Sequence, residues 1–128
     1  MYELVNHSHK GFAILSLLLS FGWLGLVLSA PRTAAPIRRG AKLAYIGAMA
    51  STGLVGLSGL ALAGLASGAW LKVWFPWLGL VAVMAHGICG VQSRKALVTG
   101  DWIRARIAVT LQVSLLIAAY GLMTVKPF

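Results

Sequence analysis

One histidine stands in an almost unbroken apolar stretch, GLVAVMAHGICGVQSRK, which covers residues 79–95. The imidazole of His86 could act as a ligand, handle a proton, or join two helices as a polar group. Two more histidines, His7 and His9, lie in the stretch NHSHKG. Two donors fall short of a closed metal site, and in a helix they point about 200° apart. His9 is the better cofactor candidate of the two, because it lies nearer the apolar segment that follows.

Other reactive side chains are few. Glu3 and Asp101 are the only carboxylates, against eleven Lys and Arg, and Cys89 is the only cysteine. Two acids so far apart in the sequence provide no carboxylate pair for acid–base catalysis or for a hard metal ion. One cysteine excludes an internal disulfide and a cysteine-cluster metal site. The sequence therefore leaves open whether the protein is an enzyme.

The composition is that of a membrane protein. Of the 128 residues, 59% are hydrophobic and 10% are charged, whereas soluble domains carry about 25% charged residues. A spanning helix needs roughly 20 apolar residues. Four stretches reach that length, at about residues 11–30, 43–66, 70–91 and 105–125. The sequence predicts one all-α domain over residues 1–128, an integral membrane bundle of four transmembrane helices.

Basic residues gather in two of the three connections between these helices. Positive charge beside spanning helices marks the cytoplasmic side, so both termini are expected on the non-cytoplasmic side. The net charge of +9 is interpreted as this topology signal and not as a nucleic-acid surface, because the basic residues stand between apolar runs. Eight residues lie on the expected cytoplasmic side and three on the other: Arg32, Arg38, Arg39, Lys42, Arg94, Lys95, Arg104 and Arg106, against Lys10, Lys72 and Lys126.

The depth of His86 in the membrane follows from helix geometry. Six residues separate it from a boundary near Gln92, which places it roughly 9 Å inside the hydrocarbon at 1.5 Å a residue. The same count brings side chains of the other helices into this layer: Trp23, Met49 and Gln112. The face around His86 is otherwise small, which suits either a close helix or a planar macrocycle. Two interpretations stay open, contact with a tetrapyrrole and a structural hydrogen bond to Gln112.

His9 is expected at the outer boundary of the membrane. In a hydrocarbon core of about 30 Å, roughly 20 Å then separates His9 from His86. The two histidines are therefore not expected to bind one haem iron from its two sides.

Small residues recur on one face of the second helix. Their spacing of three and four residues allows another helix to approach closely. The stripe either packs inside the bundle or forms a groove for a flat ligand or a partner subunit. Its members are Ala48, Thr52, Gly56, Gly59, Ala63 and Ala66.

Several stretches are similar in character to those of one known family. They are RRGAKLAYIGAMASTGLVGLSGLALA, GAWLK, AHGICG followed by SRK, and the terminal VKPF. In these the chain resembles the HemJ family of bacterial membrane proteins, protoporphyrinogen IX oxidases related to the CopD and SirB four-helix proteins. The resemblance implies a bacterial cytoplasmic membrane and haem b contact at His86, at His9, or at both. It also implies tetrapyrrole oxidation or electron transfer.

Three basic residues would lie just below such a haem. Arg94, Lys95 and Arg104 could pair with the propionates of a tetrapyrrole, or could serve only topology and lipid headgroups. The scarcity of polar groups inside the helices favours a different function, a non-catalytic accessory subunit of a larger respiratory or photosynthetic complex. The expected partners are then the lipid bilayer and other membrane subunits, or further copies of this chain.

Overall fold

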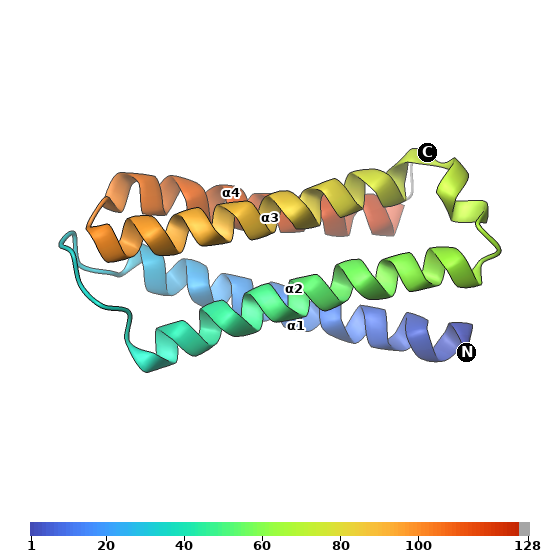
Figure 1. Cartoon of the computed structure of the whole chain (residues 1–128), viewed down its shortest axis with the longest axis horizontal. Coiled ribbons are helices and arrows are strands. Elements are labelled where there is room, and N and C mark those ends of the chain that lie inside the picture. The colour runs from blue at the N-terminus through green and yellow to red at the C-terminus, as the bar shows by residue number, and fades with distance from the viewer. Residues whose placement is uncertain (126–128) are drawn as a thin grey trace.

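The computed structural model describes residues 1–125 (Figure 1). It contains the four long helices α1 (Tyr2–Leu28), α2 (Arg39–Leu65), α3 (Trp74–Thr99) and α4 (Trp102–Val125), with a short 3-10 helix, η1 (Ala69–Lys72), before α3. All four long helices are long and apolar enough to cross a membrane. The predicted all-α class with four spanning helices is confirmed, and the chain is built as an integral membrane protein.

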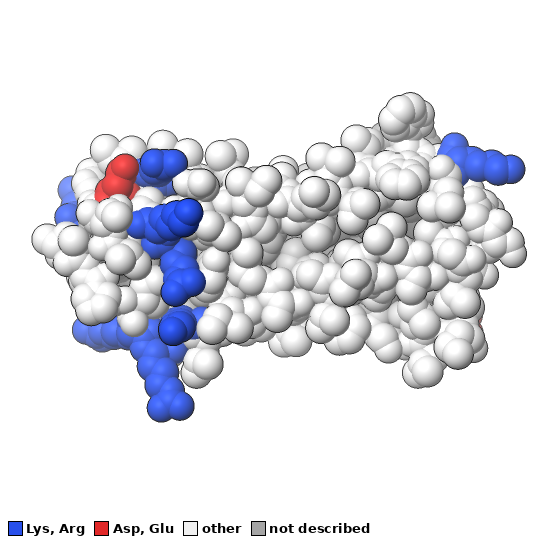
Figure 2. Space-filling view, viewed as in Figure 1, with Lys and Arg blue, Asp and Glu red and all other residues white. Residues whose placement is uncertain are grey.

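The helices form two antiparallel hairpins. α1 packs along α2 and α3 packs along α4, and the hairpins meet through α1 with α4 and α2 with α3 (Figure 1). The start of α1 and the end of α4 lie at the same end of the bundle. The opposite end carries the connections at residues 29–38 and 100–101, and most Lys and Arg side chains in view gather there (Figure 2). We call it the basic end.

The helices extend further into polar sequence than predicted. α1 begins at Tyr2 instead of residue 11, and so includes both His7 and His9. α3 runs to Thr99 instead of residue 91. Gln, Arg and Lys are good helix formers, so apolar stretches mark the part of a helix that suits lipid and not its full length. Smaller differences concern the starts of α2 at residue 39, α3 at 74 and α4 at 102, predicted at 43, 70 and 105.

Gly100 ends α3 in a left-handed conformation, with φ of 80°. A Cβ atom there would lie 2.7 Å from the backbone nitrogen of Ala34, in the connection between α1 and α2. The left-handed conformation alone costs an L-residue about 1–2 kcal/mol, and a backbone atom cannot easily move aside. Gly100 therefore lets the two connections of the basic end touch.

We expect Gly100→Ala to lower the free energy of unfolding by about 2 kcal/mol, because it adds both strain and a clash. Thermal unfolding in detergent, followed by circular dichroism, measures the change. Gly40→Ala is the matched control, since nothing lies within 4 Å of a Cβ at that position. Equal unfolding midpoints for the two variants would contradict the expectation.

The densest apolar packing lies toward the basic end. Trp23 and Val109 are completely buried there, and the rings of Trp23 and Tyr45 lie 5.1 Å apart between centroids. In the most apolar window of each helix, at most 33% of the residues are buried. Most apolar side chains of the bundle thus face outward, where a lipid bilayer would cover them.

Candidate functional site

His86 lies in the centre of the bundle and is completely buried. Its Nε2 lies 3.1 Å from the Oγ of Ser20 on α1 and 3.4 Å from the Nε2 of Gln112 on α4. The imidazole of α3 therefore joins three helices. The hydrogen bond between His86 and Gln112, one of the two interpretations of this histidine, is present.

Two further buried hydrogen bonds involve α1. The hydroxyl of Ser16 bonds that of Thr52 on α2, and the indole Nε1 of Trp23 donates to the Oγ of Ser93 on α3 at 3.0 Å. Ser16, Ser20 and Trp23 follow one another at i, i+4 and i+7, which is one face of a helix. We call these three residues and their partners the polar ladder. It ties α1 to α2 and α3 and, through His86, to α4.

The hydroxyl groups of the polar ladder were not predicted from the sequence. Trp23 was predicted only to share the depth of His86, and Ser16, Ser20 and Ser93 had no predicted role. Their signal was present in the sequence as hydroxyls at helical spacing within an otherwise apolar segment. A buried hydroxyl in a spanning helix needs a partner, and another helix is the usual source beyond its own backbone.

Two polar atoms beside the ladder have no hydrogen-bond partner among residues 1–125. They are the Nδ1 of His86 and the Oε1 of Gln112. If the Gln112 amide donates to His86 Nε2, then Nδ1 carries an unpaired proton and Oε1 is an unpaired acceptor. If the amide is flipped, its oxygen accepts a hydrogen bond from His86 Nε2. Nδ1 is then the unpaired acceptor, and the amide nitrogen is the unpaired donor.

The space around His86 is filled by side chains of the bundle. A Cβ atom on Gly90, one turn along α3, would lie 2.6 Å from the Sδ of Met49 and 3.0 Å from the Nε2 of Gln112. A Cβ on Gly87 would lie 3.8 Å from the Cε of the same methionine. Haem needs a flat slot and an imidazole nitrogen that faces the iron. As packed here, the residues around His86 do not fit a haem.

His9 lies in a separate part of the bundle. Its Nδ1 lies 2.8 Å from the Oγ of Ser58 on α2, and its ring packs over Gly59, where a Cβ would lie 3.4 Å from Cε1. Ser20, which contacts His86, comes eleven residues after His9 on α1. This spacing corresponds to about 16 Å along the helix axis. The structure keeps the two histidines apart, and they cannot bind one iron.

The three basic residues predicted below His86 point to different neighbours. The guanidinium of Arg94 lies 5.2 Å from the ring centroid of Tyr45. The Nη2 of Arg104 donates to the Oε1 of Gln92 at 2.8 Å, while Lys95 is exposed. These residues lie toward the basic end and do not form a cluster around His86.

The small-residue stripe of α2 faces the interior. Ala48, Thr52 and Ala63 are buried. Val83 of α3 packs against the backbone of Gly56, and His9 of α1 packs against that of Gly59. Helix packing within the bundle, one of the two interpretations of this stripe, is confirmed, because α1 and α3 cover the positions where a groove would lie.

No group of three or more His, Cys, Asp or Glu side chains within residues 1–125 is placed to hold a metal ion. Comparison with known proteins finds no family model, no curated protein and no solved structure that matches this chain. The resemblance to the HemJ family, with the haem b that it implies, stays a prediction that rests on the short stretches named above. Two features used in the sequence analysis, Lys126 and all of VKPF except its valine, lie outside the described residues.

Proposed function

We propose that this protein is a non-catalytic accessory subunit of a larger membrane complex, in which it holds spanning helices of other subunits by packing. One observation carries the proposal. Thr110, Ser114 and Ala118 are exposed and lie four residues apart on α4, so they form one row of small residues on the outside of the bundle. We call them the outer row. Small residues in such a row allow the backbone of another helix to approach closely.

The interior of the bundle supports catalysis less well than the outer row supports helix packing. The polar ladder satisfies most of the buried polar groups, and methionine side chains fill the space beside the glycines of α3. Packing inside the bundle uses the stripe of α2, which leaves the outer row free for a partner. The same helix-docking geometry suits a respiratory complex, a photosynthetic complex, or an assembly of several copies of this chain.

The proposed location is the bacterial cytoplasmic membrane with the basic end inside. The eight basic residues expected on the cytoplasmic side belong to α2, α3, α4 and the connections at the basic end. Positive charge at one end of a helical bundle marks the side that stays in the cytoplasm. Both termini then lie outside.

A matched pair of variants tests the proposed function. Ala118→Leu puts a bulky side chain into the outer row, whereas Ala61→Leu puts the same side chain on an exposed position of α2. The protein is extracted from the membrane in which it is made with a mild detergent and is run on a native gel. We expect the wild type and Ala61→Leu in a complex larger than the 13.5 kDa chain, and Ala118→Leu as a free subunit. A wild type that runs as a single chain, or an unchanged complex in Ala118→Leu, would refute the proposal.

A further inference from the structure

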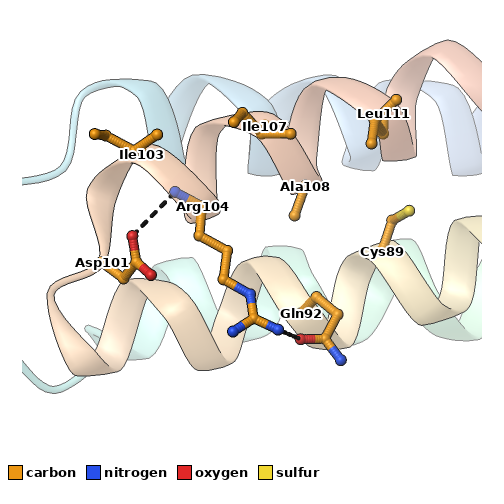
Figure 3. Close-up of a pocket in the computed structure, with 8 residues that line it drawn as sticks. All are labelled: Cys89, Gln92, Asp101, Ile103, Arg104, Ile107, Ala108 and Leu111. Carbon is orange, nitrogen blue, oxygen red and sulfur yellow. Dashed lines mark hydrogen bonds between the residues drawn. The ribbon is translucent and has the colours of Figure 1, made fainter.

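A groove of about 480 Å³ runs between α3 and α4 on the outer surface, near the basic end (Figure 3). Cys89 of α3 and Ile107, Ala108 and Leu111 of α4 line its apolar part. Ile107 and Leu111 are exposed and Ala108 is buried. From Arg104 to Leu111 the groove follows α4 for about 10 Å, at 1.5 Å a residue. Its apolar part lies on the outer surface of the bundle, where the acyl chains of a bilayer would reach it.

Polar side chains line part of the groove. Asp101 and Ile103 lie at the connection between α3 and α4, and the side chain of Arg104 reaches from that end to Gln92, in the middle of the groove (Figure 3). The hydrogen bond from Arg104 Nη2 to Gln92 Oε1, 2.8 Å long, holds the guanidinium across the space between the helices. The Oδ1 of Asp101 accepts a hydrogen bond from the backbone N–H of Arg104 at 3.2 Å, and no ion pair joins the two side chains in the described residues.

The surrounding charge is positive. Asp101 is the only acid near the basic end, since the other, Glu3, lies at the far end of the bundle. Arg32 and Arg106 both lie by the ring of Trp102, with guanidinium carbons 4.2 Å and 5.1 Å from its centroid. An indole between cationic groups at the end of a spanning helix is typical of the headgroup level of a bilayer. These two guanidinium groups raise the positive charge at this level of the bundle, and Arg104 is the basic residue that lines the groove itself.

We propose that this groove binds an anionic phospholipid. The phosphate pairs with the free N–H groups of Arg104, and one acyl chain lies along Ile107 and Leu111. Arginine binds phosphate oxygens through charge-assisted hydrogen bonds, and the apolar part of the groove suits a chain attached to that phosphate. Ile107 and Leu111 lie on the same face of α4 as the outer row, beside Thr110. The test below uses the purified chain in detergent, so its failure is distinguishable from a failure of the proposed function.

The single thiol of the chain provides the readout. Cys89 lines the groove and is partly exposed, so a lipid held there slows its reaction with N-ethylmaleimide. The protein in detergent micelles is supplied with phosphatidylglycerol or with phosphatidylcholine of identical acyl chains. We expect the reaction to be severalfold slower with phosphatidylglycerol than with phosphatidylcholine. Inorganic phosphate alone should leave the rate unchanged, because it has no chain to cover the thiol.

Two variants distinguish binding in the groove from a general attraction of the anionic lipid to the positively charged protein. Arg104→Gln should abolish the difference between the two lipids, whereas Lys95→Gln removes an equal charge from an exposed position of α3 and should retain it. If Cys89 of the wild type reacts at the same rate with both lipids, only bulk lipid covers the thiol. That result alone would overturn the proposal. A lipid difference that persists in Arg104→Gln, or protection by inorganic phosphate, would also overturn it.

Discussion

Replacement of Trp23 by alanine is expected to lower the free energy of unfolding by about 4 kcal/mol, within the range for large aromatic side chains in a core. The side chain is completely buried, and its indole donates to Ser93 at 3.0 Å and stacks at a tilt against Tyr45. Alanine leaves a large cavity between α1 and α3 and an unpaired hydroxyl beside it. Unfolding in mixtures of mild detergent and dodecyl sulfate, followed by far-ultraviolet circular dichroism, measures the loss.

The control for this variant is Trp74→Ala, at the start of α3. The side chain of Trp74 is 71% exposed, so its loss should change the free energy of unfolding by less than about 0.5 kcal/mol. Trp23→Phe should fall between the two, because it keeps most of the ring volume and loses the hydrogen bond. If Trp23→Ala were no less stable than Trp74→Ala, the packing of α1 against α3 described here would be wrong.

His86→Ala is the second large effect, with an expected loss of about 3 kcal/mol. The substitution removes a fully buried ring and leaves Ser20 and Gln112 without their partner. Hydrogen bonds between membrane helices contribute only about 0.6 kcal/mol each on average, so most of the loss comes from the cavity. The same detergent titration measures it.

The matched control is His7→Ala. Its side chain is 75% exposed and lies on the outer face of α1, so its removal should leave the unfolding curve unchanged. A His86→Ala protein as stable as the wild type would contradict the role of His86 as a joint between helices.

The fold could be predicted from the sequence because lipid leaves few choices. A spanning segment must satisfy its own backbone hydrogen bonds, so four long apolar stretches imply four helices. The fixed rise of a helix also brought His86 and Gln112 into one layer, and they are hydrogen-bonded. The helix ends were less predictable. Polar residues such as Gln92 and Lys95 continue a helix without lengthening its apolar stretch.

What the sequence could not provide was the rotation of each helix about its axis. That rotation directs Ser20 to His86, and it separates the inward stripe of α2 from the outer row of α4. It also decides whether the space beside Gly90 is empty or filled. In this structure the side chain of Met49 fills that space. The same row of small residues would appear in the sequence whether the space were filled by a side chain or empty.

The claim that His86 joins helices and is packed too closely to hold a haem is tested most directly by an absorption spectrum. The protein is purified in mild detergent from the membrane in which it is made, and the spectrum is recorded oxidised and after reduction with dithionite. We predict no Soret band in either state, since the ring of His86 is enclosed by Ser20, Gln112 and the side chains around Gly90. A Soret band that persists in His7→Ala and disappears in His86→Ala would contradict the claim and would identify His86 as a haem ligand.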